Sequence, residues 1–203
     1  MDKKRDENPH YSPRTKVGQE TKKTICVNFL AGAGAGKSTM ATLVQGFSKL
    51  HGITSEYAPE FAKDLAWEGR LELPVNSVLI FGEQHNRQFR LNGKVDCIIS
   101  DSPLILTSVY NPNDSLFHAF VMQEFRKYEN LNFYVRRTKP YIPRGRQGDA
   151  KTATKIDDRV MKMLDDNQVP YTVINGDVEG ANQVISMVLQ RLNMKQQYKI
   201  CKI

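Results

Sequence analysis

The segment at residues 31–39, AGAGAGKST, constrains the fold of this chain more than any other feature. It follows an apolar, β-branched run at residues 24–30, and it precedes residues 40–50, where apolar side chains recur at helical spacing. A strand, a glycine-rich turn and a helix in this order allow successive backbone N–H groups to surround a phosphate. We therefore predict a phosphate-binding loop, because a flexible Gly/Ala linker would not explain Lys-Ser-Thr at the start of the helix.

The positions of this loop have predicted roles in binding ATP and Mg²⁺. Small residues let the backbone approach the β-phosphate, Lys37 reaches the β- and γ-phosphates, and the Ser38 hydroxyl can ligate Mg²⁺. The common pattern G-x-x-x-x-G-K-[ST] begins with glycine, whereas this chain has Ala31. We expect the loop to tolerate this alanine if residue 31 keeps a negative φ. The predicted cofactor-binding residues are Gly32, Ala33, Gly34, Ala35, Gly36, Lys37, Ser38 and Thr39.

The rest of the chain alternates short apolar runs with longer amphipathic stretches, which is typical of a parallel sheet covered by helices. Further strands are predicted at residues 53–57, 95–100, 131–135 and 171–175. Helices are predicted after Pro59, after Pro74, and at residues 115–128, 152–167 and 181–197. These elements make one α/β domain at residues 24–197, between a disordered basic tail at 1–23 and a short basic tail at 198–203.

The net charge of +7 is located at the two ends of the chain, because residues 24–190 hold 18 basic and 18 acidic side chains. Basic tails are usually solvated ends, so the basic composition alone does not indicate a nucleic-acid-binding protein. No apolar run approaches the roughly 20 residues of a membrane span, and the first residues lack the apolar stretch of a secretory signal. The three cysteines fit a reducing compartment, and we expect a cytoplasmic protein.

Five segments, in their order along the chain, resemble the P-loop nucleoside and nucleotide kinases. They are AGAGAGKST, APEFAKDLAWEGR (58–70), EQHNRQ (83–88), IISDSP (98–103) and RRTKPYIPRGRQ (136–147). The resemblance is particularly to small phage proteins labelled AAA-family ATPases, which are similar to ribosylnicotinamide kinases and would act in the host cytoplasm. It implies a P-loop NTPase fold with three α/β/α layers, a five-stranded parallel sheet in the order 2-3-1-4-5, and a mobile lid between strands four and five.

Two acidic residues are candidates for the chemistry. Asp101 follows an apolar strand, so we expect it at the carboxyl edge of the sheet, where it can hold Mg²⁺ together with Ser38. Glu60 resembles the acidic residue that nucleoside kinases hold beside the acceptor hydroxyl, and it is the candidate base. The alternatives are an aspartate that caps a strand end and a glutamate that caps a helix. Ser102 stands where the deoxynucleoside kinases have an arginine, so we do not assign the role of that arginine to this position.

A second group of residues is predicted to contact the acceptor. Lys63 lies one turn after Glu60, where it can pair with that glutamate or approach an acceptor phosphate. Gln84 and Arg87 share a helical face, which suits contact with a nucleobase or a phosphate but also fits a solvated surface. Trp67 can stack on a base or pack in the core. The four histidines lack metal-ligand spacing, so no zinc site is predicted.

Residues 136–151 interrupt the alternation with two prolines, two glycines and six basic side chains. The segment resembles a kinase lid, in which arginines close over the transferring phosphoryl group and exclude water. The resemblance implies that Arg137, Arg144 and Arg146 are catalytic, and the alternative is a solvated basic loop.

These features predict an ATP- and Mg²⁺-dependent phosphotransferase that acts on a nucleoside or nucleotide, in the first place a deoxynucleoside monophosphate. Two other acceptors stay open, which are a hydroxymethylated base in DNA, as for 5-hydroxymethyluracil DNA kinases, and nicotinamide riboside. An alternative of another class is a nucleotide-dependent regulatory ATPase switch. No membrane partner is predicted, and a homodimer is left open.

Overall fold

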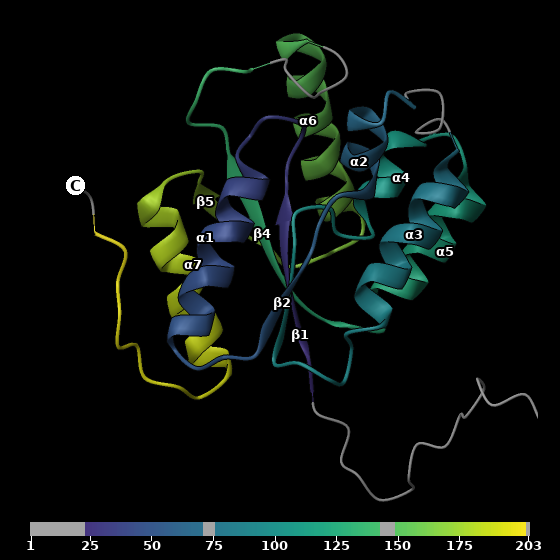
Figure 1. Ribbon diagram of the computed structural model, residues 1–203. Helices are drawn as coiled ribbons and strands as arrows, with labels where there is room; N and C mark the ends of the chain where they lie inside the picture. Colours follow the sequence, from purple (N-terminus) through teal and green to yellow (C-terminus); the bar gives the residue numbers. More distant parts are fainter. Residues whose placement is uncertain (1–22, 71–75, 143–148, 202–203) are drawn as a thin grey trace, which may run out of the picture.

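The computed structural model describes residues 23–70, 76–142 and 149–201, which form a five-stranded sheet between two layers of helices (Figure 1). The strands are β1 (Ile25–Leu30), β2 (Ser55–Ala58), β3 (Cys97–Ser100), β4 (Glu129–Arg136) and β5 (Thr172–Asn175). They lie in the order β2-β3-β1-β4-β5, and every neighbouring pair is parallel. The predicted fold class and strand order are therefore confirmed.

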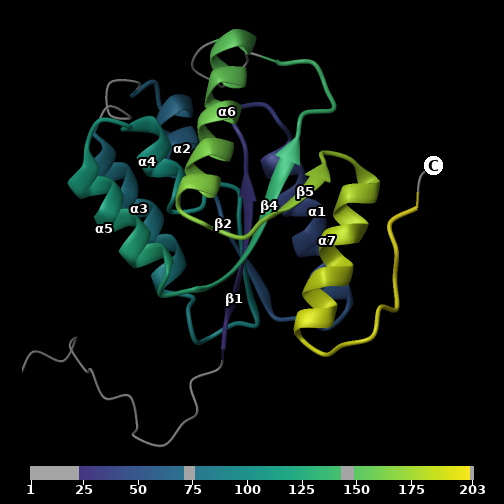
Figure 2. The same ribbon diagram turned by 180° about the vertical axis from the view of Figure 1, so that it is seen from behind.

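The helices are divided between the two faces of the sheet (Figures 1 and 2). One face is covered by α1 (Lys37–Leu50) and α7 (Val178–Arg191), which pack against each other. The other side carries α2 (Phe61–Trp67), α3 (Ser77–Phe89), α4 (Leu106–Tyr110), α5 (Ser115–Phe125) and α6 (Ala150–Asp166). No helix in these described ranges is long and apolar enough to cross a membrane.

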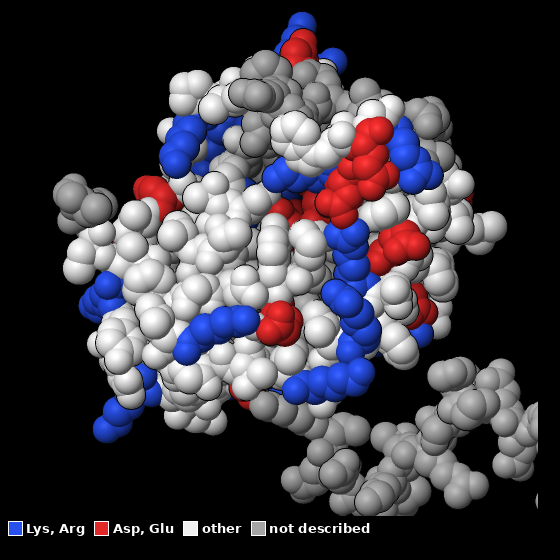
Figure 3. Space-filling view, viewed as in Figure 1, with Lys and Arg blue, Asp and Glu red and all other residues white. Residues whose placement is uncertain are grey.

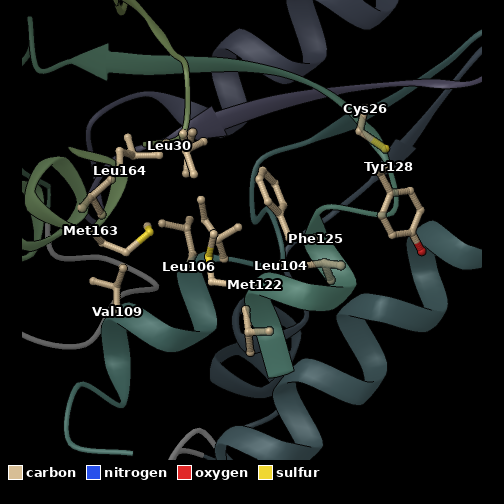
Figure 4. Close-up of a cluster of buried hydrophobic side chains, with 14 of the residues drawn as sticks. Cys26, Leu30, Leu104, Leu106, Val109, Met122, Phe125, Tyr128, Met163 and Leu164 are labelled. Carbon is tan, nitrogen blue, oxygen red and sulfur yellow. The ribbon is translucent and has the colours of Figure 1, made fainter. Parts of the chain in front are cut away.

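The alternation of side chains along β1 divides the core into two parts. Ile25, Val27 and Phe29 pack with α1 and α7, whereas Cys26 and Leu30 pack with α4, α5 and α6. Figure 4 shows the second part, where Leu106, Met163 and Leu164 lie near Leu30, and Tyr128 lies near Cys26. Because both faces of the sheet are buried at its centre, the central strands β1 and β3 read in the sequence as nearly continuous apolar runs, whereas the edge strands β2 and β5 are partly exposed.

The three cysteines differ in their access to solvent. Cys26 and Cys97 are buried on the neighbouring strands β1 and β3, and Cys201 is exposed. Burial, followed by the charge of the nearby Cys97, raises the pKa of Cys26 to about 12. Cys26 is therefore a protonated thiol at neutral pH, as expected for a small side chain in an apolar core.

Two helices differ from the expectation from sequence. The helix α4 has no predicted counterpart, because a single turn of mostly buried residues does not produce a helical period. The last helix ends at Arg191, so its predicted extension to Gln197 is wrong. Asn193 adopts a positive φ of 55°, which is a left-handed conformation that stops an α-helix.

The chain after α7 docks back onto the domain. Ile200 packs against the core cluster that contains residues of α1 and α7, and its N–H and carbonyl both hydrogen-bond the Asn182 side chain at 2.8 Å. The Tyr198 N–H donates to His51 Nε2 at 3.1 Å. Residues 198–201 of the predicted basic tail are thus attached to the domain, whereas the predicted tail at 1–23 lies outside the described residues except for Lys23.

Candidate functional site

The phosphate-binding loop connects β1 to α1 and contains two left-handed glycines. Gly34 and Gly36 have φ values of 75° and 107°, which side chains with a Cβ rarely adopt. Ala31 is not among the described non-glycine residues with positive φ, so the condition for alanine at this position is met. The helix α1 begins at Lys37 with no side-chain cap and no acidic residue in its first turn. Its first N–H groups are therefore available to an anion.

The Lys37 side chain lies within this loop. Its Nζ donates to the Gly32 carbonyl at 3.0 Å, and only 8% of the residue is exposed. The residue also lines the large cavity described below. The ammonium group is thus held near the N-terminus of α1, where its charge adds to the positive end of the helix dipole.

Asp101 and Ser38 meet at the carboxyl edge of β3. The Ser38 hydroxyl donates to Asp101 Oδ2 at 2.5 Å, and Asp101 is only 1% exposed. The other carboxylate oxygen, Oδ1, is buried and has no hydrogen-bond partner among the described residues. Burial, followed by the neighbouring Asp101 carboxylate, raises the pKa of Tyr57 above its ordinary range, so Tyr57 is a neutral phenol beside this pair.

The Ser38 and Asp101 oxygens fit Mg²⁺. A hydroxyl and one carboxylate are enough protein ligands for this ion when nucleotide phosphates and water complete its coordination. The buried Asp101 Oδ1 is a carboxylate oxygen that a cation would satisfy. In the described part of the chain, no cluster of three or more His, Cys, Asp or Glu side chains could hold a metal ion by itself.

A cavity of about 1010 Å³ lies beside the loop. Loop residues form one wall, and residues of α2, α3, α4 and α6 form the others. Glu60 and Lys63, the residues expected near an acceptor, both line it. Glu60 occupies the N-cap position of α2, but its side chain does not cap the helix, so capping does not account for this glutamate. The volume is sufficient for a nucleoside next to a nucleotide phosphate.

Gln84 and Arg87 are not among the described residues that line this cavity. Gln84 Oε1 accepts from the Phe61 N–H at 3.1 Å, and its Nε2 is buried without a described partner. Arg87 pairs with Asp64 at 2.5 Å, and its guanidinium lies 5.2 Å from the centre of the Phe61 ring. These contacts hold the start of α2, and with it Glu60, in place.

Of the three predicted lid arginines, the structure describes only Arg137, because Arg144 and Arg146 lie outside the described residues. Arg137 directly follows β4. It pairs with Asp157 of α6 at 2.8 Å and donates to the Ala33 carbonyl at 2.9 Å. Its contacts are therefore with the phosphate-binding loop and α6.

Sequence reasoning missed Tyr57 and Asp157. Tyr57 lies in β2 beside Ile99, and its position next to an expected carboxyl edge was a usable signal. No sequence pattern near Asp157 indicated its contacts, because its partners Gly32 and Arg137 lie 125 and 20 residues away in the sequence. Trp67 is 64% exposed and does not line the cavity, so its interpretation as a core residue is wrong.

Comparisons with known proteins agree with this geometry. A family model described as an AAA domain matches residues 26–180. No curated protein matches the sequence. Two solved structures of NadR protein, one in complex with NR and one with NAD and AMP-PNP, each give a TM-score of 0.62 at 15% and 16% identity. A thymidylate kinase from Ehrlichia chaffeensis gives a TM-score of 0.54 at 16% identity.

The extent of these matches decides what they show. The NadR matches cover 87% of this chain but 54% and 52% of the NadR chains, so this chain spans about half their length. The thymidylate kinase match covers 84% of this chain and 99% of the kinase. At such low identities these structures show a common fold alone. Because the family model covers most of the chain, the protein belongs to the AAA domain family.

Proposed function

We propose that this protein is an ATP- and Mg²⁺-dependent phosphotransferase that transfers the γ-phosphoryl group to a nucleoside or nucleotide. The Ser38 and Asp101 pair, with its buried unpartnered oxygen, supports this function most directly. It lies at the start of the uncapped helix α1, next to Lys37, and Glu60 lines the same cavity. One wall thus carries the groups that phosphate and metal require, and another carries a carboxylate for an acceptor.

Each of these groups would have a separate task. The N–H groups at the start of α1, together with Lys37, would bind and orient the β- and γ-phosphates. Ser38 and Asp101 would hold Mg²⁺, which neutralises charge on the phosphates when it is bound. Glu60 would take the proton of the attacking hydroxyl. The walls from α2, α3 and α4 would position the acceptor and exclude water.

The charges in the cavity lining favour a nucleoside hydroxyl over a deoxynucleoside monophosphate. Apart from Lys37, the described lining holds one basic side chain, Lys63, and two carboxylates, Glu60 and Asp114. An acceptor phosphate would bring about two further negative charges beside these carboxylates. The hydroxyl groups of a nucleoside can instead donate to them. We therefore assign a nucleoside as the acceptor. The deoxynucleoside monophosphate expected from the sequence is the alternative acceptor.

The transfer reaction is tested with Lys37→Ala and a matched control, Lys49→Ala. Lys49 lies on the same helix, but it is exposed and pairs with Glu56 at 3.2 Å. Loss of the charge that faces the phosphates is expected to lower kcat/KM by about 10²- to 10³-fold. The control should retain its activity in an assay that follows both ATP consumption and the phosphorylated acceptor. Retention of more than about a tenth of the activity by Lys37→Ala would contradict the assignment of the loop.

A screen of acceptors separates the substrates and the competing class of function. The protein is supplied with ATP and nucleosides including nicotinamide riboside, deoxynucleoside monophosphates, or an oligonucleotide that contains 5-hydroxymethyluracil. Phosphorylation of a nucleoside, with a lower kcat in Glu60→Gln, supports the proposal. Preference for a monophosphate or the oligonucleotide would overturn the acceptor and keep the phosphotransferase. ATP hydrolysis without any phosphorylated acceptor, stimulated by a protein partner, would indicate a regulatory ATPase switch.

A further inference from the structure

Three segments that are distant in the sequence meet at Asp157. The Gly32 N–H donates to Asp157 Oδ1 at 2.6 Å, and Arg137 donates to Asp157 Oδ2 at 2.8 Å. Arg137 also donates to the Ala33 carbonyl at 2.9 Å. One carboxylate of α6 and one guanidinium after β4 therefore bind two consecutive residues of the phosphate-binding loop from outside.

Close packing leaves these groups little freedom to move. A Cβ on Gly32 would lie 2.5 Å from the Ala153 carbonyl oxygen and 2.9 Å from Asp157 Oδ1. A Cβ on Gly34 would lie 2.9 Å from the ring of Tyr141. The first turns of α6 and the ring of Tyr141 thus lie directly against the loop, at distances where a Cβ on either glycine would force a neighbour to shift.

The contacts extend from Asp157 to Lys37, the lysine proposed to bind the nucleotide phosphates. Gly32 donates its N–H to Asp157 and accepts Lys37 Nζ on its carbonyl at 3.0 Å. The position of residue 32 therefore affects where the Lys37 ammonium lies. Arg137 binds the next carbonyl, at Ala33, so both residues are fixed by side chains that approach from α6 and the end of β4.

We propose that Asp157 and Arg137 form a latch that positions the phosphate-binding loop, and with it Lys37, for nucleotide binding. The latch adds a positioning role to the proposed function. It depends on that proposal for one assumption, which is that the loop binds ATP. Asp157 is a positioning residue, since it acts through Gly32 and Arg137. The structure thus assigns Arg137 to the loop, which differs from the direct contact with the transferring phosphoryl group that the kinase resemblance implies.

The charge relation within the latch makes its two members interdependent. Asp157 and Arg137 are both only partly exposed, so removal of one leaves the other without its charged partner in a poorly solvated position. Asp157→Asn keeps an oxygen for the Gly32 N–H but loses the charge that holds Arg137. Asp157→Ala removes both contacts. The asparagine variant should therefore have the smaller effect, and it remains informative if the alanine variant does not fold.

The latch is tested by equilibrium binding of a fluorescent ATP analogue, which needs no acceptor and no turnover. Asp157→Asn and Arg137→Ala are each expected to weaken binding by about tenfold or more, as for other residues that orient ligand-binding groups. The double variant should be no weaker than the worse single variant, because both substitutions disrupt one unit. Asp158→Asn is the matched control, since Asp158 is the exposed neighbour on the same helix and should bind normally.

Steady-state kinetics distinguishes positioning from a general loss of structure. A shift of the loop should raise KM for ATP while KM for the acceptor stays within about twofold, in variants whose thermal unfolding remains cooperative. Additive effects of Asp157→Asn and Arg137→Ala would overturn the latch and favour direct contact of Arg137 with the phosphates. Normal binding by both variants would also overturn it. If Lys37→Ala likewise binds the analogue normally, the proposed function fails as well.

Discussion

At the scale of single residues, the phosphate-binding loop requires glycine for two different reasons. Gly34 and Gly36 adopt positive φ values, so they need glycine for their backbone conformation. Gly32 has no positive φ, and it needs glycine because α6 occupies the space that a Cβ would take. Ala31 is fully buried and meets neither condition, so a small apolar side chain is sufficient there.

The steric reason at Gly32 predicts opposite effects for two glycine-to-alanine substitutions. Gly46 lies inside α1, and nothing is within 4 Å of the place where its Cβ would be. Gly46→Ala should stabilise the fold by about 0.5–1 kcal/mol because alanine favours a helix. Gly32→Ala should destabilise it by about 1–3 kcal/mol because the loop or α6 must shift. Urea unfolding measures both values, and a stabilised Gly32→Ala would disprove the steric explanation.

At the scale of elements, the first residue of β4 connects two other parts of the fold. Glu129 pairs with Lys23, which precedes β1, and with Arg191 at the end of α7, each at 2.6 Å. Burial alone would raise the pKa of Glu129, but the hydrogen bonds from Lys23 and Arg191 outweigh it and hold this pKa below its usual range. The ionised carboxylate is therefore the form that stabilises the fold.

The lowered pKa of Glu129 predicts stability that depends on pH. The contribution is complete above the unfolded pKa of about 4.3, and it is lost as the pH falls through the lower folded value. Because Lys23 and Arg191 are largely exposed, screening limits it to about 1 kcal/mol or less. Glu129→Gln should lower Tm at pH 7 by up to about 2–4 °C, with a smaller difference below about pH 4. A difference in Tm that does not change with pH would rule out this role.

The elements also show why some features could be predicted from the sequence and others could not. The meeting of Ser38 with Asp101 was predictable, because both follow parallel strands whose carboxyl ends share one edge. The helix α4 was not predictable, because its five residues are too few to show a helical period of apolar side chains. The contact of Asp157 with the loop depends on the packing of α6, which no local pattern encodes. Exposure of Trp67 likewise depends on where α2 lies in the fold.

At the scale of the whole molecule, the charge distribution separates the domain from its ends. Figure 3 shows basic and acidic side chains interspersed over the face seen in Figure 1, in agreement with the equal numbers of both kinds at residues 24–190. A balanced surface does not attract a large polyanion over long distances. A small acceptor would therefore depend on the cavity, whereas a DNA acceptor would depend on the basic ends as well.

Removal of residues 1–22 distinguishes these two kinds of acceptor. The deletion takes away six basic and four acidic side chains, but it keeps Lys23 and its ion pair with Glu129. For a nucleoside acceptor, kcat/KM should stay within about twofold at about 0.15 M salt, because salt screens the net charge of the deleted segment and an uncharged acceptor gains little from that charge. For a DNA acceptor, each lost phosphate contact should flatten the plot of log K against log salt by about one unit. A flatter plot with oligonucleotide would contradict the nucleoside assignment.

The unequal burial of the three thiols makes the unaltered chain suitable for labelling at a single position. The thiolate is the form that reacts with a maleimide, and Cys26 is both buried and protonated at neutral pH. Cys97 is also buried, whereas Cys201 is exposed and directly follows Ile200, which is bound to Asn182. A maleimide dye would therefore attach at Cys201 and report by fluorescence whether this segment stays docked when nucleotide is added, without any substitution in the protein.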